Sequence, residues 1–206
     1  MSEHAFGVVG SETLHDGAVV ALRVDQVQMP GGRVAGREVV EHRAAVAVLA
    51  LDAGDRVLLL RQYRHPVATR LWELPAGMLD VDGEAPLSAA QRELAEEAGL
   101  SASQWALLVD VVSSPGFTDE SVRVYLATNL GEVTAGTGID DEEAEMTTRW
   151  VGLDDAVRQV LTGEIVDAST MAGLLALAAA RASGTALRPV DAPWPLRSTA
   201  FDARQG

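Results

Sequence analysis

The chain has 206 residues, and its composition of 48% hydrophobic and 22% charged residues is typical of a globular protein rather than a disordered or fibrous one. Its 30 acidic and 16 basic residues give a net charge of −14, so we expect no binding to nucleic acid or to an anionic membrane surface. Cysteine is absent, which excludes disulfides and thiolate chemistry, and no apolar stretch reaches the roughly 20 residues of a membrane span, so we expect a soluble cytoplasmic protein.

Extended strands dominate the predicted secondary structure. Near the N-terminus, Val19–Met29 and Arg33–Val40 flank a turn at Pro30–Gly32 and predict a strand ribbon. Further strands are expected at Ala45–Leu51, Val57–Tyr63, Leu107–Val112, Val122–Ala127 and Thr148–Val151, and helices at Leu87–Ala98, Asp155–Leu161 and Ser169–Ala182. Because strands outnumber helices and do not alternate with them regularly, the pattern predicts an α+β fold with a mixed sheet and flanking helices.

Two connections have the composition of functional loops. Ser113–Glu120 places Ser-Ser-Pro-Gly between two strands, and Gly131–Glu145 is rich in glycine and then strongly acidic. The tail from Arg188 onward is rich in proline and is expected to be irregular, with Trp194 as its docking point.

The helix expected at Leu87–Ala98 carries an unusual acidic face. Glu93, Glu96 and Glu97 together span about 100° of its circumference, while apolar residues occupy the other side. Like charges at this spacing destabilise a helix, so a positive partner is expected among them. Hard carboxylate oxygens suit Mg²⁺ or Mn²⁺, and Arg92 is placed to orient a neighbouring glutamate. A solvated acidic face would produce the same pattern.

The segment from Gly77 to Leu100 resembles the Nudix box, Gly-x5-Glu-x7-Arg-Glu-U-x-Glu-Glu-x-Gly-U, in which U is a bulky apolar residue. The chain matches it at Glu84, Arg92–Leu94, Glu96–Glu97 and Gly99–Leu100, with six residues instead of five between Gly77 and Glu84. The extra residue lies in the loop before the helix, where a longer connection is tolerated. The resemblance implies an α/β/α sandwich and a hydrolase.

Residues outside the box resemble the ADP-ribose pyrophosphatase branch of that family. The similar stretches are Arg61–Arg64, Glu73–Gly77 and Ser114–Glu120. In that branch a proline fifteen residues past the box marks a preference for ADP-ribose, and Pro115 occupies this position. The resemblance implies hydrolysis of ADP-ribose to AMP and ribose 5-phosphate. Two alternatives are a Nudix hydrolase of another nucleoside diphosphate, such as an ADP-sugar or NADH, and an ADP-ribose sensor that does not hydrolyse it.

The resemblance also assigns site residues. It implies metal ligation by Glu93, Glu96, Glu97 and the carbonyl of Ala76, and a catalytic base in the acidic loop, at Glu143 or Glu142, with Glu143 the first choice. Arginines bind phosphate bidentately and aromatic rings stack on adenine. The expected substrate-binding residues are Arg37, Arg64, Met78, Phe117 and Glu120.

Two of these residue choices have structural alternatives. Arg37 could instead pair with Glu41 on the strand surface. Phe6 is a second candidate for stacking on adenine, or a core anchor near the N-terminus. We expect residues 1–43 to form a ribbon subdomain for dimerisation and substrate binding, residues 44–187 the hydrolase domain, and residues 188–206 the tail. A ribbon that cannot bury both faces on one sheet also suggests a homodimer.

Overall fold

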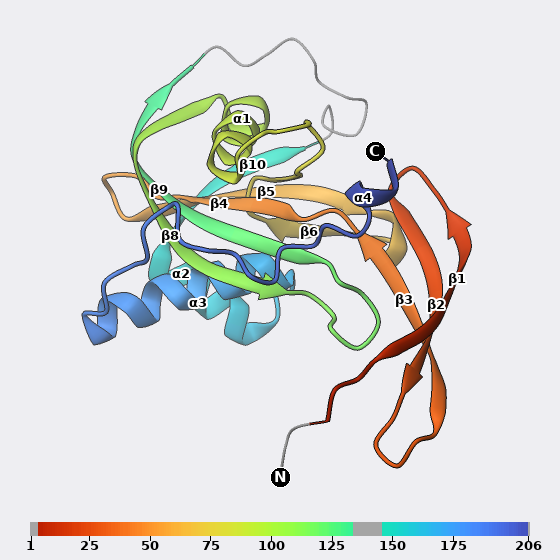
Figure 1. Cartoon of the computed structure of the whole chain (residues 1–206). Helices are drawn as coiled ribbons and strands as arrows, with labels where there is room; N and C mark the ends of the chain where they lie inside the picture. The colour runs from red at the N-terminus through yellow and green to blue at the C-terminus, as the bar shows by residue number, and fades with distance from the viewer. Residues whose placement is uncertain (1–3, 134–145, 206) are drawn as a thin grey trace. The chain divides into compact units, whose positions relative to one another are not determined.

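A computed structural model describes residues 4–133 and 146–205 (Figure 1). The chain divides into two compact units. The first unit contains residues 1–44, 112–121 and 196–206, and the second contains residues 45–111 and 122–195. In the described part of the chain, every helix is too short or too polar to cross a membrane.

The first unit is built on a ribbon of three antiparallel strands in the order β1-β2-β3. Its strands are β1 (Val8–Asp16), β2 (Val20–Gln28) and β3 (Val34–His42). The hairpin expected around Pro30–Gly32 is present, since Gln28 pairs with Val34 across it. The loop at residues 113–120 bonds to β3 through two backbone contacts between Val40 and residues Phe117 and Asp119, and the short helix α4 (Asp202–Gln205) completes the unit.

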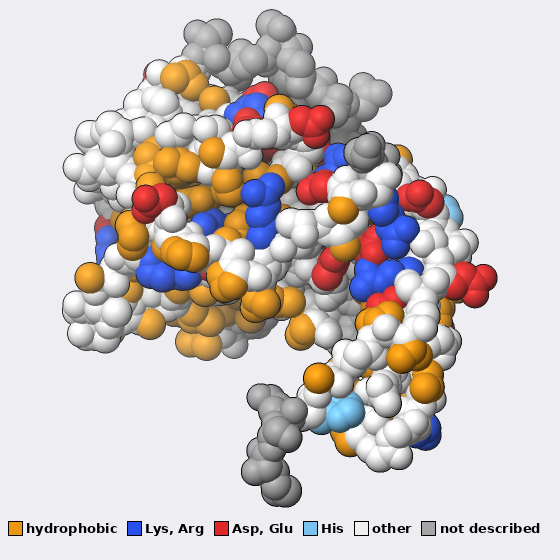
Figure 2. All heavy atoms as spheres, viewed as in Figure 1, with side chains coloured by type: hydrophobic (Ala, Val, Ile, Leu, Met, Phe, Trp, Pro, Cys, Tyr) orange, Lys and Arg blue, Asp and Glu red, His pale blue; other side chains and the backbone are white. Residues whose placement is uncertain are grey.

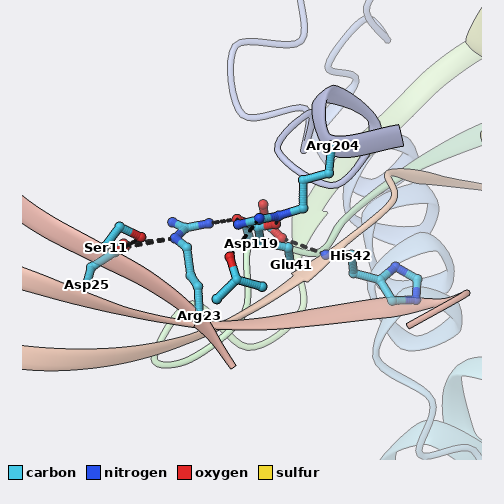
Figure 3. A network of polar contacts seen from close by, with 8 residues as sticks. Ser11, Arg23, Asp25, Glu41, His42, Asp119 and Arg204 are labelled. Atoms are coloured by element: carbon cyan, nitrogen blue, oxygen red, sulfur yellow. Dashed lines mark hydrogen bonds and ion pairs between the residues drawn. The ribbon is translucent and has the colours of Figure 1, made fainter. Parts of the chain in front are cut away.

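A charged network links α4 to this ribbon (Figure 3). Its centre is the carboxylate of Glu41, which is 2% exposed and accepts hydrogen bonds from the guanidinium groups of both Arg23 and Arg204. Arg204 Nη2 donates to Glu41 Oε1 at 2.9 Å, and Arg23 Nε donates to Asp25 at 3.0 Å. Two arginines around one buried acid satisfy the charge that burial would otherwise penalise. The hydrogen bond from Arg204, assisted by Arg23, lowers the pKa of Glu41 below its ordinary value.

This network predicts an acid-sensitive contribution to stability. Because the pKa of Glu41 is lower in the folded than in the unfolded protein, its contribution is complete above the unfolded value, 4.5, and is lost as the pH falls through the folded value. We expect Glu41→Gln to lower the free energy of unfolding by about 3 kcal/mol at pH 7. Urea unfolding of both proteins between pH 3 and 8 checks this, and a difference that stays constant below pH 4.5 would contradict it.

The described residues of the second unit form two sheets. One has the order β7-β4-β9-β8, with β4 (Ala45–Ala50) parallel to β9 (Ser121–Glu132) and antiparallel to β7 (Ala76–Met78). The other has the order β10-β5-β6 and is antiparallel. The strands of this second sheet are β5 (Arg56–Arg64), β6 (Thr69–Glu73) and β10 (Thr147–Gly152). The remaining strand of the four-stranded sheet is β8 (Leu100–Val112). A 3-10 turn, His65–Val67, connects β5 to β6.

Helices lie on both sides of these sheets, so the expected α+β fold and α/β/α sandwich are confirmed (Figure 1). Helix α1 (Pro86–Ala98) packs on β4 and β7. On the other side, α2 (Leu153–Thr162) packs on β5 and β10, and α3 (Ala168–Ser183) packs on β4 and β6. The core joins strand residues such as Leu49, Leu59 and Val124 to Val160 of α2 and Leu174 of α3. All six residues of β4 are apolar and five of them are buried, as expected of a strand that helices cover on both faces.

The proline-rich segment after α3 docks as expected through Trp194. The guanidinium of Arg123 lies 4.6 Å from the centre of the Trp194 ring and donates to the carbonyls of Ala192, at 2.9 Å, and Pro193, at 3.2 Å. Asp110 accepts from Arg123 Nε at 2.7 Å and balances its charge. Arg123 is only 3% exposed, so the tail covers a buried cation.

Two features of the first unit differ from the expectations drawn from the sequence. Strand β1 is not among the expected strands, because all nine of its residues are exposed and its side chains show no buried alternating face. Phe6 is not a core anchor: it is 60% exposed, and its ring lies edge-on to that of His4, with the centres 4.8 Å apart.

Candidate functional site

Helix α1 presents the acidic face at the position expected from the sequence. Pro86 occupies its first turn, where a missing N–H costs nothing. Gly99 ends it in a left-handed conformation, with φ at 62°, and its N–H donates to Ala95 O at 3.0 Å. A side chain would strain this conformation, so Gly99 fixes where the helix stops. These two ends hold Glu93, Glu96 and Glu97 on one turn.

Arg92 supplies the positive charge that the acidic face requires. Its Nη1 donates to Glu93 Oε1 at 2.7 Å and to Glu96 Oε2 at 3.0 Å. Its Nε and Nη2 donate to the two oxygens of Glu84 at 3.2 and 3.1 Å, so the longer loop before the helix still brings Glu84 to the box. The hydrogen bonds that Arg92 donates to Glu84, and then the nearby carboxylates of Glu93 and Glu96, raise the pKa of Arg92 further above its ordinary value.

Glu93 is the buried carboxylate of the group. It is 9% exposed, and this burial raises its pKa while Arg92 opposes the shift. Its side chain lies directly on the backbone of β7: a Cβ at Gly77 would lie 2.0 Å from Glu93 Oε1. Gly77 therefore leaves the space that the carboxylate fills. A cation placed beside this buried carboxyl group would favour its charged form.

Glu97 connects α1 to the same strand. Its Oε2 accepts a hydrogen bond from the backbone N–H of Ala76 at 2.9 Å. Ala76 pairs with Ala47 of β4, so the contact joins the helix to the edge of the sheet. The structure thus brings together Ala76, Glu93, Glu96 and Glu97, the four residues that the resemblance implies as metal ligands.

The donor chemistry of these residues fits a hard divalent cation such as Mg²⁺. Within residues 4–133 and 146–205, no three acidic or histidine side chains already converge as a cation site. Arg92 engages one oxygen each of Glu93 and Glu96, and the Ala76 amide engages one oxygen of Glu97. A cation would take over part of the charge balance that Arg92 now provides.

Arg64, expected to contact substrate, is held by a residue that the sequence did not single out. Arg64 Nε donates to Glu73 Oε1 at 3.0 Å and its Nη2 donates to Glu73 Oε2 at 2.6 Å. These hydrogen bonds raise the pKa of Arg64 further above its ordinary value. Glu73 is 5% exposed, whereas 44% of the Arg64 side chain is exposed. The pair fixes a guanidinium at the end of β5 while leaving it accessible.

Four other predicted substrate residues are divided between the units. Met78 ends β7 in the second unit, opposite Ala45, and is half-buried. Arg37, Phe117 and Glu120 belong to the first unit: Phe117 is 55% exposed, and a carboxylate oxygen of Glu120 lies 3.8 Å from His42 Nδ1. The two candidate bases, Glu142 and Glu143, lie outside the described residues.

The alternative pairing of Arg37 with Glu41 is wrong. Arg37 instead donates to the carbonyl of Gly36 at 3.0 Å and contacts Met29 Sδ, while Arg23 and Arg204 hold Glu41. Four residues of an extended strand span about 13 Å, which places the two side chains too far apart for an ion pair.

Comparisons with known proteins show what the chain is similar to. A model of the NUDIX domain matches residues 40–174. The chain is 53% identical over 205 residues to the ADP-ribose pyrophosphatase of Mycobacterium tuberculosis, which covers 100% of this chain and 99% of the relative. It is 36% identical over 167 residues to the methanol dehydrogenase activator of Bacillus methanolicus, covering 79% of this chain and 87% of the relative. A crystal structure of an ADP compounds hydrolase superposes with a TM-score of 0.76 at 19% identity, covering 90% of this chain and 100% of that one.

Proposed function

This chain belongs to the Nudix family, and from that premise we propose that it hydrolyses ADP-ribose to AMP and ribose 5-phosphate with a bound divalent cation. The observation that carries the substrate assignment is the 53% identity to an ADP-ribose pyrophosphatase over essentially the whole of both chains. A Nudix domain alone would not distinguish among nucleoside diphosphates. The fold shared with an ADP compounds hydrolase is consistent with this assignment.

The acidic turn of α1 suits the chemistry of a pyrophosphate. Hydrolysis breaks one P–O bond of the bridge, water provides the new oxygen, and charge accumulates on the phosphate oxygens. We propose that Glu93, Glu96, Glu97 and the carbonyl of Ala76 hold Mg²⁺ or Mn²⁺, which when bound neutralises those oxygens and makes water a better nucleophile. Arg92 keeps the carboxylates in place through its contacts to Glu84, Glu93 and Glu96.

The other residues supply binding and proton transfer. Arg64, fixed by Glu73, is proposed to bind a phosphate oxygen of the substrate, and Met78 to line the same site. Following the resemblance, Arg37, Phe117 and Glu120 are proposed to contact the nucleoside. The base that takes the proton from water is proposed to be Glu143, with Glu142 as the second choice. Comparing Glu143→Gln with Glu142→Gln at saturating Mg²⁺ separates them, because the base variant alone loses turnover.

Product analysis in isotopically labelled water tests the activity and the site of attack together. Turnover of ADP-ribose in H₂¹⁸O with Mg²⁺ should yield AMP and ribose 5-phosphate, with the label in one of the two products. A panel containing ADP-ribose, an ADP-sugar and NADH identifies the preferred substrate. Calorimetric binding of ADP-ribose without release of AMP would contradict hydrolysis and favour the sensor alternative.

We further propose that residues 1–43 form a dimerisation and substrate-binding subdomain, residues 44–187 the hydrolase domain and residues 188–206 the tail, and that the protein is a homodimer. Support comes from the ribbon, where large apolar side chains lie at the surface (Figure 2). Between 48% and 62% of each is exposed; they are Phe6, Val8, Val9, Leu14, Val19 and Val34. Exposed apolar side chains gathered on one ribbon are typical of an association surface.

The dimer predicts a measurable mass. Light scattering coupled to size exclusion should give twice the 21.7 kDa of one chain. The double variant Val8→Asp/Leu14→Asp should shift the population toward the monomer, since buried charges without partners oppose association. Leu161→Asp is the control, because Leu161 is an apolar residue of α2 that is 77% exposed and lies outside the ribbon. A wild-type mass of a single chain at micromolar concentration would contradict the dimer.

A further inference from the structure

The connection from β6 to β7 carries two of the contacts that organise the proposed site. Glu73, immediately before it, holds Arg64, and Ala76, immediately after it, donates to Glu97. Only Leu74 and Pro75 lie between these two residues. A small displacement of this connection would therefore move a substrate-binding guanidinium and a proposed metal ligand together.

Three backbone groups of this connection are tied to three different elements. The N–H of Leu74 donates to the hydroxyl of Thr170 on α3 at 3.0 Å. The carbonyl of Pro75 accepts from the N–H of Val48 on β4 at 2.8 Å. The N–H of Ala76 donates to Glu97 on α1 at 2.9 Å. Proline has no N–H, so these three bonds fix the path of the backbone.

The hydroxyl of Thr170 acts both as a hydrogen-bond donor and as an acceptor. It donates its one proton to Asp167 Oδ2 at 2.8 Å, so the oxygen is left to accept the N–H of Leu74. Asp167 is the N-cap of α3 and also accepts the backbone N–H of Thr170 at 2.8 Å. Thr170 is completely buried, so water cannot replace the bond to Leu74 if the hydroxyl is removed.

Helix α3 has little freedom to adjust at this point. One turn further along, Gly173 lies so close to the sheet that a Cβ would be 3.2 Å from Leu74 Cδ1 and 3.0 Å from Val124 Cγ1. The helix therefore lies directly on the side chain of Leu74 while Thr170 holds its backbone. This close packing transmits the position of α3 to the β6–β7 connection.

We propose that Thr170 is a positioning residue, which sets Ala76 and Glu73 for the proposed hydrolysis through its hydrogen bond to the backbone of Leu74. The inference rests on the proposed function for its kinetic consequences. A buried threonine at a helix N-terminus could otherwise contribute only to capping. The neighbouring Ser169 separates the two roles, because it also donates to Asp167 Oδ2, at 2.6 Å, and belongs to the cap rather than to the Leu74 contact.

Four variants test the proposal. Thr170→Val keeps the shape of the side chain and removes the hydroxyl, and Thr170→Ser keeps the hydroxyl. Ser169→Ala is the control for capping. Thr170→Ala removes the hydroxyl without adding a methyl group and provides the same test if the valine variant does not fold.

Two measurements without substrate come first: hydrogen exchange and the titration of Mn²⁺. In Thr170→Val, hydrogen exchange at the amides of Leu74 and Ala76 should accelerate at least tenfold, while amides at the centre of β4 keep their protection. Titration of Mn²⁺ should show weaker binding, by roughly tenfold, because Ala76 and Glu97 are displaced together. Thr170→Ser and Ser169→Ala should stay within about twofold of wild type in both measurements.

Kinetics with ADP-ribose and Mg²⁺ complete the test. We expect kcat/KM of Thr170→Val to fall by tenfold to a hundredfold, with near-complete recovery in Thr170→Ser. Equal losses in Thr170→Val and Ser169→Ala, or wild-type exchange and Mn²⁺ affinity in Thr170→Val, would overturn the positioning role. If wild type itself fails to hydrolyse ADP-ribose, the proposed function is wrong, and the exchange and Mn²⁺ results still decide the role of Thr170.

Discussion

Replacing Glu97 by glutamine is expected to reduce turnover of ADP-ribose by at least about a hundredfold and to leave the fold intact. The glutamine carbonyl can still accept the N–H of Ala76, so the contact between α1 and β7 is preserved. What disappears is the negative charge that a divalent cation requires. Steady-state kinetics over a range of Mg²⁺ concentrations, together with circular dichroism, separates these two effects.

A neutralised acid outside the box provides the control for Glu97. Asp154→Asn removes one exposed carboxylate from the first turn of α2 and should leave turnover within about twofold of wild type. A Glu97→Gln enzyme with near-normal turnover at limiting Mg²⁺ would remove Glu97 from the proposed metal site.

Replacing Gly77 by alanine is expected to disrupt the site from β7, the strand that faces Glu93. The added Cβ would lie 2.0 Å from the Glu93 carboxylate, so either β7 or Glu93 must move. Overpacking of this kind costs about 1–3 kcal/mol of stability, and displacement of Glu93 should lower turnover by more than tenfold. Thermal unfolding and kinetics measured on the same preparation report both effects.

Gly152→Ala is the matched control for this change. Gly152 is the last residue of β10 in the same unit, and the nearest atom to an added Cβ is 3.9 Å away. Because Gly152 is also the N-cap of α2, the variant should unfold within about 1 kcal/mol of wild type, and it should retain its activity. If Gly77→Ala behaves in the same way, Glu93 does not depend on the close approach to β7.

The sequence predicted those parts of the site that a single local segment determines. The acidic face of α1, its end at Gly99 and the contact from Arg92 to a neighbouring glutamate all follow from spacing along one helix. The longer loop before Glu84 also had the expected small effect, because Glu84 still bonds to Arg92.

Contacts between distant segments could not be predicted in this way. Thr170 looks like an ordinary helix residue in the sequence, and only the fold places its hydroxyl against Leu74, 96 residues earlier. The contact between Glu73 and Arg64 could not be predicted either, because it depends on the pairing of β5 with β6. Glu41 binds Arg204 across 163 residues, whereas the sequence suggested a local partner, Arg37.

Strand β1 shows a different limit. Periodicity detects a strand through the contrast between its buried and exposed faces, and β1 has no buried residue to create that contrast. Its pairing with β2 satisfies the backbone groups along one edge of β1, while its apolar side chains stay at the surface. The same feature that concealed β1 from the pattern supports its proposed role in association.

The position of a cation relative to the acidic turn of α1 tests the account most directly. A crystal soaked in Mn²⁺ with a non-hydrolysable ADP-ribose analogue should show an anomalous peak within bonding distance of Glu93, Glu96 or Glu97, beside the pyrophosphate. Arg92 should then have given up part of its contact with Glu93 and Glu96. An analogue bound with those three carboxylates still in their present contacts, including those to Arg92 and the Ala76 amide, and no peak beside them, would contradict it.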